Sequence, residues 1–218
     1  MSLQPPDEWT FKTPVVAEAF DQHVREQLPW YELTTKVVTH IARHYIPEGG
    51  LVYDIGASTG NIGLALAPTL EARNAHLVAV DNSPEMAKIY RGPGVFVVDD
   101  AEAMEYEPCD LVVCFLCLMF IRPRYRRALV TRLVDALNPG GALIIFDKSV
   151  PVCGYPSVVM QRLALAGKAE AGVPADEILK KELSLSGVQR PLERHEIPAR
   201  AVEIFRFGDF AGWLIEKP

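Results

Sequence analysis

Two segments of the chain combine residue types that suit the binding of a ribose-bearing ligand. Residues 51–60 read LVYDIGASTG, an apolar run that ends in glycines, and an apolar-periodic stretch over 61–70 follows. This order predicts a strand, a tight turn and a helix, whose first N–H groups are free and whose glycines let a ligand approach the backbone. Residues 77–83, LVAVDNS, form another apolar run that ends on Asp81. An acidic side chain there can accept hydrogen bonds from both ribose hydroxyls.

The spacing within the glycine loop separates it from the common phosphate-binding loops. The loop reads Asp54-x-Gly56-x-x-x-Gly60, with Ser58 where the G-x-G-x-x-G fingerprint of dinucleotide sites has its second glycine. No Gly-Lys-Ser or Gly-Lys-Thr follows, which excludes a P-loop. The loop therefore departs from both patterns.

The same loop offers one rival chemistry. Gly56-Ala-Ser-Thr-Gly60 also matches the G-x-S-x-G nucleophile elbow of α/β hydrolases, with Ser58 as the nucleophile. Asp147 and His195 are then the downstream acid and base. However, the loop follows the first strand of the predicted sheet, and no oxyanion-hole segment precedes it. A hydrolase is thus the weaker interpretation.

The elements around these residues alternate between strands and helices. Apolar runs predict strands at 51–55, 77–81, 95–98, 110–116 and 142–147, and a terminal hairpin with strands at 200–206 and 210–216. Helical periodicity predicts helices at 15–28, 31–45, 60–70, 84–90, 123–137, 156–171 and 175–185. Asn138-Pro-Gly-Gly141 predicts a stop before the fifth strand. The order indicates an α/β fold with a doubly wound, largely parallel sheet and a ligand at the carboxyl ends of its strands.

Length and composition narrow the class of protein. The 218 residues fit one domain over the whole chain, 1–218, with residues 1–13 as a loose arm. A formal net charge of −6 disfavours broad electrostatic capture of nucleic acid. The N-terminus is polar and no apolar stretch reaches the roughly 18 residues of a membrane helix, so we expect a cytoplasmic protein. Buried free thiols and no metal site are expected from the four cysteines, Cys109, Cys114, Cys117 and Cys153.

Taken together, these motifs resemble the class I S-adenosylmethionine (SAM)-dependent methyltransferases and, within that superfamily, the carboxy-SAM synthases. The matching features are Phe20-Asp21, Pro29, Tyr31, Val52-Tyr-Asp-Ile-Gly56, Asp81-Asn-Ser-Pro84, Leu137-Asn-Pro-Gly-Gly-Ala-Leu143, Lys148 and Phe205-Arg-Phe-Gly208. The resemblance implies a Rossmann-like fold with a mostly parallel seven-stranded sheet, a C-terminal antiparallel hairpin and lid helices over residues 14–46. It also implies SAM as the cofactor and allows a homodimer.

The resemblance further implies roles for individual residues. The glycine loop would lie against the amino-acid part of SAM, Asp81 beside the ribose, and Asp100 near the adenine amino group. Tyr31 would close over the cofactor. The full cofactor-binding set implied is Tyr31, Asp54, Gly56, Ala57, Ser58, Gly60, Asp81, Asn82, Asp100, Ala101 and Phe115. Two simpler interpretations stay open, in which Asp100 only caps a turn and Tyr31 is an ordinary packed aromatic.

Catalytic residues are less well defined. The resemblance implies that carboxy-SAM formation needs an arginine from the C-terminal region, supplied within the chain or across a dimer, to hold the carboxylate of prephenate. The chain departs from that group in Ala57, where cysteine is usual, and in Phe115, where asparagine is usual. The catalytic candidates are Tyr31, His23, Arg190, Arg194 and Lys148. The basic cluster Arg122–Arg127 is either a solvated helix start or a site for a substrate carboxylate or phosphate.

Three functions remain open at this point. The first is transfer of the SAM methyl group to a small-molecule or nucleotide-pathway acceptor, which Phe115 and the unplaced arginine favour. The second is conversion of SAM and prephenate to carboxy-SAM for tRNA wobble uridine modification, and the third is a non-catalytic SAM-binding subunit. The segment after the fourth strand, 114–120, lacks the Asp/Asn-Pro-Pro-Tyr motif of enzymes that methylate amino groups of nucleic acids. A small-molecule substrate is therefore expected, with nucleic acid disfavoured as a direct substrate.

Overall fold

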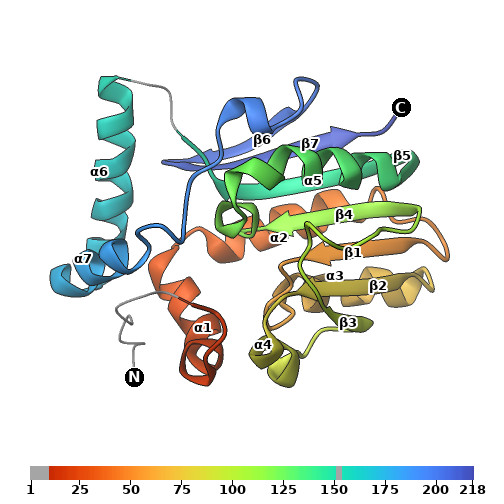
Figure 1. Cartoon of the computed structure of the whole chain (residues 1–218), viewed down its shortest axis with the longest axis horizontal. Helices are drawn as coiled ribbons and strands as arrows, with labels where there is room; N and C mark the ends of the chain where they lie inside the picture. The colour runs from red at the N-terminus through yellow and green to blue at the C-terminus, as the bar shows by residue number, and fades with distance from the viewer. Residues whose placement is uncertain (1–9, 151–153) are drawn as a thin grey trace.

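The fold is built on a seven-stranded sheet, in a computed structural model that describes residues 10–150 and 154–218. The strand order is β3-β2-β1-β4-β5-β7-β6 (Figure 1). The strands are β1 (Leu51–Ile55), β2 (His76–Asp81), β3 (Val95–Val98), β4 (Cys109–Phe115), β5 (Leu137–Lys148), β6 (Val202–Phe207) and β7 (Phe210–Glu216). β1 to β5 pair in parallel, and β7 is antiparallel to both β5 and β6. This confirms the predicted mostly parallel sheet with a terminal antiparallel hairpin.

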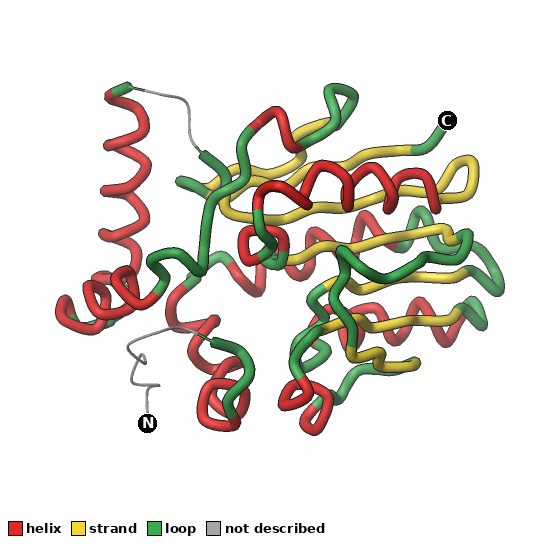
Figure 2. Tube along the Cα trace, viewed as in Figure 1, coloured by secondary structure: helices red, strands yellow, loops and turns green. Residues whose placement is uncertain are grey.

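Helices cover both faces of this sheet (Figure 1), as the red helices on either side of the yellow strands in Figure 2 also show. The helices are α1 (Pro14–Gln27), α2 (Tyr31–Ala42), α3 (Asn61–Ala72), α4 (Pro84–Ile89), α5 (Pro123–Ala136), α6 (Tyr155–Glu170) and α7 (Ala175–Ser184), with 3-10 turns η1 (Leu118–Phe120) and η2 (Arg194–Glu196). α2 and α3 pack on one face through Val38 and Leu66, and α5 packs on the other through Leu129. Strands buried on both faces are mostly apolar along their length, which explains the continuous apolar run at 111–115 and the run at 51–55, where Asp54 is the one charged residue.

The segment Asn138-Pro-Gly-Gly141 differs from its prediction as a stop before the strand. β5 already pairs with β4 at Leu137, and the register then shifts so that Leu111 faces Ala142. Gly141 is required by the close approach of the two chains, because a Cβ atom there would lie 2.8 Å from the carbonyl oxygen of Asp110. Gly140 adopts a φ of +80° within the same irregularity. The glycines thus make a bulge inside the strand.

The N-terminal residues contribute more than the expected loose arm. Residues 1–9 lie outside the described part of the chain, but residues 10–13 lead directly into α1 (Figure 1). The ring of Phe11 packs edge-on against Phe20 and Phe120, with centroid distances of 5.4 and 4.9 Å. The Ser83 hydroxyl donates a 2.6 Å hydrogen bond to the carbonyl oxygen of Phe11. This part of the arm is therefore fixed beside the carboxyl end of β2.

The basic cluster Arg122–Arg127 does not form a uniformly solvated helix start. Arg122, Arg124 and Arg127 are exposed, but Arg126 is buried and 1 % exposed. Its guanidinium donates hydrogen bonds to the carbonyl oxygens of Ile121, Met119, Arg190 and Pro191 and to Oε2 of Glu196. Arg126 thus ties α5 to η1 and to residues 190–196, and this member of the cluster is structural.

Three further expectations concern free thiols, a metal site and a membrane span. Cys109 and Cys114 are buried free thiols, as predicted, Cys117 is half-buried and free, and Cys153 lies outside the described residues. In residues 10–150 and 154–218 no group of histidine, cysteine and acidic side chains is arranged to hold a metal ion. None of the helices in those residues is long and apolar enough to cross a bilayer. The cytoplasmic location, the homodimer and the single-domain boundaries stay predictions.

Candidate active site

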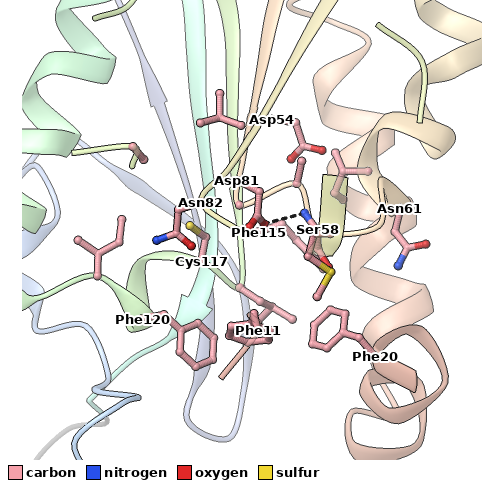
Figure 3. A pocket seen from close by; sticks show the side chains of 18 of the residues that line it. Phe11, Phe20, Asp54, Ser58, Asn61, Asp81, Asn82, Phe115, Cys117 and Phe120 are labelled. Carbon is pink, nitrogen blue, oxygen red and sulfur yellow. Dashed lines mark hydrogen bonds between the residues drawn. The ribbon is translucent and has the colours of Figure 1, made fainter. Parts of the chain in front are cut away.

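A cavity lies at the carboxyl ends of β1, β2 and β4, under α1 and α2 (Figure 3). Nine of the eleven predicted cofactor-binding residues line it, namely Tyr31, Asp54, Gly56, Ala57, Ser58, Asp81, Asn82, Ala101 and Phe115. The two that do not are Gly60 and Asp100. Segments that are far apart in the sequence therefore meet at one edge of the sheet, as the strand order requires.

The glycine loop needs its glycines for close packing. A Cβ atom on Gly56 would lie 2.5 Å from Sγ of Cys117, and Gly56 has a φ of +74°. A Cβ atom on Gly60 would lie 2.6 Å from the backbone nitrogen of Gly92, and Gly60 has a φ of +96°. Gly60 therefore acts through the packing of residues 90–92 on the loop, which explains why it does not line the cavity itself.

The loop geometry argues against the hydrolase alternative. The Ser58 hydroxyl is placed against Sδ of Met86 at 3.4 Å. Asp147 accepts hydrogen bonds from the backbone N–H groups of Met119 and Lys148, and Nδ1 of the exposed His195 lies 3.3 Å from the Glu193 carboxylate. The three nominated residues thus have separate partners, and no Ser-His-Asp relay forms among them.

Asp81 anchors the loop and closes one side of the cavity. Its Oδ2 accepts a hydrogen bond from the backbone N–H of Ser58 at 3.0 Å (Figure 3), and its Oδ1 accepts one from Ser83 at 2.9 Å. Burial raises the pKa of Asp81, and these two N–H groups oppose the rise. Each carboxylate oxygen keeps a second lone pair, so the side chain can still accept hydrogen bonds from a ligand.

Asp54 is a buried carboxylate beside Asp81. It is 1 % exposed, and its Oδ2 has no hydrogen-bond partner among the described residues. Burial and then the negative charge of Asp81 raise the pKa of Asp54 to about 7, while a backbone N–H of Gly63 opposes the rise. An unpartnered buried carboxylate is costly unless a positive group approaches it. The side chain is therefore suited to a cationic ligand.

The charged residues that line the cavity all have one sign. Asp99 and Glu102 line it together with Asp54 and Asp81, and none of its described lining residues is lysine, arginine or histidine. An acidic, partly buried site favours a positively charged ligand and disfavours one with phosphate groups. Asp99 and Glu102 were missed by sequence reasoning, although they flank the predicted Asp100-Ala101 pair. Asp100 itself is exposed, and its Oδ1 accepts a 2.7 Å hydrogen bond from Asn82, another lining residue.

A hydrogen-bond network fastens the lid helices to the glycine loop. Oδ1 of Asp21 in α1 accepts hydrogen bonds from the Thr59 hydroxyl and from Nδ2 of Asn61, the latter at 2.8 Å. Nδ2 of Asn61 also donates to the Tyr31 hydroxyl at 3.0 Å, and burial raises the pKa of Tyr31 to about 12. Tyr31 packs edge-on against Phe115 at 5.5 Å. Tyr31 is thus a neutral phenol at the wall of the cavity. Asn61 also lines the cavity, and it was not among the residues predicted from the sequence.

The remaining catalytic candidates lie away from this cavity. His23 and Lys148 line a second cavity beside it. Arg190 is exposed and lies 3.9 Å from the Glu193 carboxylate. The guanidinium of Arg194 donates hydrogen bonds to backbone carbonyls of residues 197–199. The structure therefore does not bring either arginine of this chain to the acidic cavity.

Comparison with known proteins identifies a family model and two relatives that match this chain. Residues 52–141 match a family model described as a methyltransferase domain. The carboxy-S-adenosyl-L-methionine synthase of Wolinella succinogenes is 32% identical over 218 residues, covering 93% of this chain and 91% of that protein. The enzyme of the same name from Staphylococcus epidermidis is 29% identical, covering 96% and 93%.

Solved structures show the same fold. The magnesium protoporphyrin IX methyltransferase of Synechocystis, with bound S-adenosylhomocysteine (SAH), superposes with a TM-score of 0.58 at 16% identity, covering 89% of this chain and 86% of that one. A SAM-dependent methyltransferase structure from Methanococcus maripaludis gives a TM-score of 0.57 at 17% identity and covers 96% and 95%. The acidic cavity fits SAM, which carries a sulfonium and an ammonium group. The chain is a SAM-dependent enzyme that belongs to the carboxy-SAM synthase family of the class I methyltransferase fold.

Proposed function

We propose that the enzyme transfers the methyl group of SAM to a small-molecule acceptor. The observation that carries the proposal is the acidic lining of the site, in which Oδ2 of Asp54 has no hydrogen-bond partner among the described residues and none of the described lining residues is basic. SAM supplies an electrophilic methyl group next to its sulfonium. Loss of the methyl group removes the sulfonium charge. Buried carboxylates would therefore bind the cationic SAM more tightly than the SAH product, which would assist the replacement of SAH by SAM.

The chain's own residues orient the cofactor and exclude water. Asp81 would hold the ribose, and the N–H groups of the glycine loop would face the amino-acid part. Tyr31 and Phe115 would close over the methyl group. An acceptor heteroatom would form a bond to the methyl carbon as the carbon–sulfur bond breaks, and the acceptor proton would leave to solvent.

A second candidate is carboxy-SAM synthesis, which the full-length similarity to enzymes of that name favours. That reaction would need a cationic group at the carboxylate of its co-substrate. Arg190 and Arg194 of this chain have other partners, and Ala57 and Phe115 occupy positions where the group usually has cysteine and asparagine. These features make methyl transfer our first proposal.

Mass spectrometry distinguishes the two candidates. The purified protein is incubated with SAM that carries an isotope-labelled methyl group, together with a filtered small-molecule extract, and separately with prephenate. We expect a labelled acceptor and SAH in the first incubation and unchanged SAM in the second. A carboxylated SAM species that forms only with prephenate would instead establish carboxy-SAM synthesis.

The Asp81→Ala variant tests the proposed ribose contact. We expect the affinity for SAM to fall by about 1.5–3 kcal/mol, the usual contribution of a hydrogen bond to a charged group. Isothermal titration calorimetry measures this loss, with Asp135→Ala as the control because Asp135 is exposed and does not line the cavity. An unchanged affinity in Asp81→Ala would remove Asp81 from the binding site.

A further inference from the structure

A second cavity, of about 650 Å³, lies beside the SAM site, between α1, α6 and α7. Phe11, Phe20, Leu116 and Phe120 line both cavities, so the two cavities adjoin along these four side chains. Figure 3 shows the three phenylalanines together on one side of the SAM site. A ligand in the second cavity would therefore lie next to the cofactor.

The wall of the second cavity is mostly apolar. Val24 in α1, Leu165 in α6 and Ile178 in α7 line it from the helices, and Met119 and Phe210 line it from η1 and β7. Small-molecule sites usually enclose roughly 300–1,000 Å³ and combine an apolar wall with a few polar groups. The second cavity thus has the size and the lining of a site for a small apolar molecule.

The charged side chains of this wall pair with one another. The titratable groups that line the cavity are His23, Lys148, Lys168, Lys181, Glu182 and Asp209. Nζ of Lys148 lies 3.4 Å from the carboxylate of Asp209, and Nζ of Lys168 lies 2.8 Å from that of Glu182. These four charges balance, so neither pair calls for an ionic ligand.

The two other titratable groups of the wall carry little charge near neutral pH. Burial, followed by the charge of Lys168, lowers the pKa of Lys181 to about 6. Burial, followed by the charges of Lys181 and Lys168, lowers the pKa of His23 to about 4. Near pH 7.5 the wall as a whole is therefore close to neutral. An ion entering it would lose its hydration without meeting an opposite net charge, which favours a neutral ligand.

Gln27, in the last turn of α1, supplies a neutral polar group to this wall. It is 6% exposed, and neither its Nε2 nor its Oε1 has a hydrogen-bond partner among the described residues. Oδ1 of Asp209, on the same wall, is likewise buried without one. Leaving a buried donor and acceptor unpaired costs free energy. A neutral ligand group that both donates and accepts hydrogen bonds would remove this cost.

The positions of Phe20 and Gln27 indicate the length of such a ligand. Phe20, Val24 and Gln27 line the cavity at positions i, i+4 and i+7 of α1, which share one face of the helix. Phe20 adjoins the SAM site, and Gln27 lies seven residues further along, which is about 10 Å at 1.5 Å per residue. A molecule that reaches both residues must be elongated.

We propose that the second cavity is the acceptor site and takes an elongated, neutral, apolar molecule with a carboxamide-like head group. The head group would exchange hydrogen bonds with the Gln27 amide, and the apolar body would lie against α1, α6 and α7. The end that accepts the methyl group would reach the cofactor beside Phe20. The word acceptor rests on the proposed methyl transfer, whereas the binding of such a molecule does not.

The first test uses three probes with one apolar chain and different head groups, namely octanamide, octanoate and octylammonium. Calorimetry at pH 7.5 on the full chain saturated with SAH is expected to show octanamide binding about tenfold or more tightly than either ion. This comparison uses the wild type alone and does not depend on the folding of a variant. Equal or tighter binding of octanoate or octylammonium would overturn the proposal. Displacement of SAH by octanamide would also overturn it, because the probe would then occupy the SAM site.

The Gln27→Leu variant tests the head-group contact. Leucine keeps the apolar bulk and removes both unpaired polar atoms, so the melting temperature of the ligand-free protein should rise. Its affinity for octanamide should fall about five- to tenfold, because the hydrogen bonds to the amide are lost. Gln22→Leu, at an exposed position of the same helix, should bind octanamide like the wild type. An unchanged affinity in a folded Gln27→Leu would overturn the assigned contact.

The binding site and the proposed function can fail separately. Octanamide binding with the expected preferences, together with no labelled product from the small-molecule extract, would support the site and contradict methyl transfer. A labelled product that forms while octanamide does not bind would support methyl transfer and overturn the assignment of the second cavity.

Discussion

Asp54→Asn is expected to weaken SAM binding by about 10- to 100-fold at pH 8, while raising the melting temperature of the ligand-free protein. The carboxylate is fully buried, and burial together with Asp81 raises its pKa to about 7. At pH 8 the wild type must keep this unpaired charge in the apolar interior when no ligand is bound. The amide has nearly the same shape and no charge. The variant therefore avoids the free-energy cost of burying a charge, but it also loses the electrostatic attraction for the cationic ligand.

The pH dependence follows from the direction of this shift. An unfolded aspartate loses its proton near pH 4, whereas native Asp54 retains it up to about pH 7. Stability contributed by this group is therefore fully present below about pH 4 and is lost as the pH rises to about 7. SAM binding favours the ionised form, so the affinity of the wild type should fall as the pH drops below 7. In Asp54→Asn this dependence should be reduced.

Asp135→Asn is the matched control, because it makes the same change at an exposed position outside the cavity. Calorimetry at pH 6, 7 and 8 measures the affinities, and thermal melts without ligand measure stability. Asp147 also titrates near pH 7 because of its burial, and its contribution is common to all three proteins. A variant that binds SAM like the wild type at pH 8 would show that Asp54 does not face the cationic part of the ligand.

Arg126→Met is expected to lower the free energy of unfolding by about 3–5 kcal/mol. The guanidinium is buried and donates hydrogen bonds to four backbone carbonyls and to Glu196. Methionine fills part of the space but leaves these acceptors without donors, and it leaves the charge of Glu196 buried without its ion-pair partner.

Arg127→Met isolates this effect from the general loss of an arginine. Arg127 is the exposed neighbour in α5, and a surface substitution there should change stability by no more than about 0.5 kcal/mol. Urea denaturation of both variants and the wild type gives the free energies. A loss in Arg126→Met no larger than that in Arg127→Met would mean that the buried network contributes little to the fold.

Much of the site was predictable because its residues lie at fixed positions in local patterns. Glycines after an apolar strand and an acidic residue after the next strand indicated a nucleoside site, and both segments line the cavity. Strand and helix periodicity depends on neighbouring residues alone, so it predicted the order of the elements. Neither of the two interpretations of the basic cluster Arg122–Arg127 holds at Arg126, because its partners at residues 190–196 are more than 60 positions away in sequence.

The sequence by itself determined the alternating elements, the glycine loop and the acidic residue at the end of β2, since each is encoded by the spacing of nearby residues. Only the tertiary structure decided which distant side chains meet. It joined Asp21 and Tyr31 to Asn61, and it assembled Lys148, Lys168 and Lys181 around one cavity. The physical reason is that such contacts depend on how helices pack on the sheet. That packing follows from the burial of whole helix and sheet faces against each other, and it cannot be predicted from the spacing of neighbouring residues.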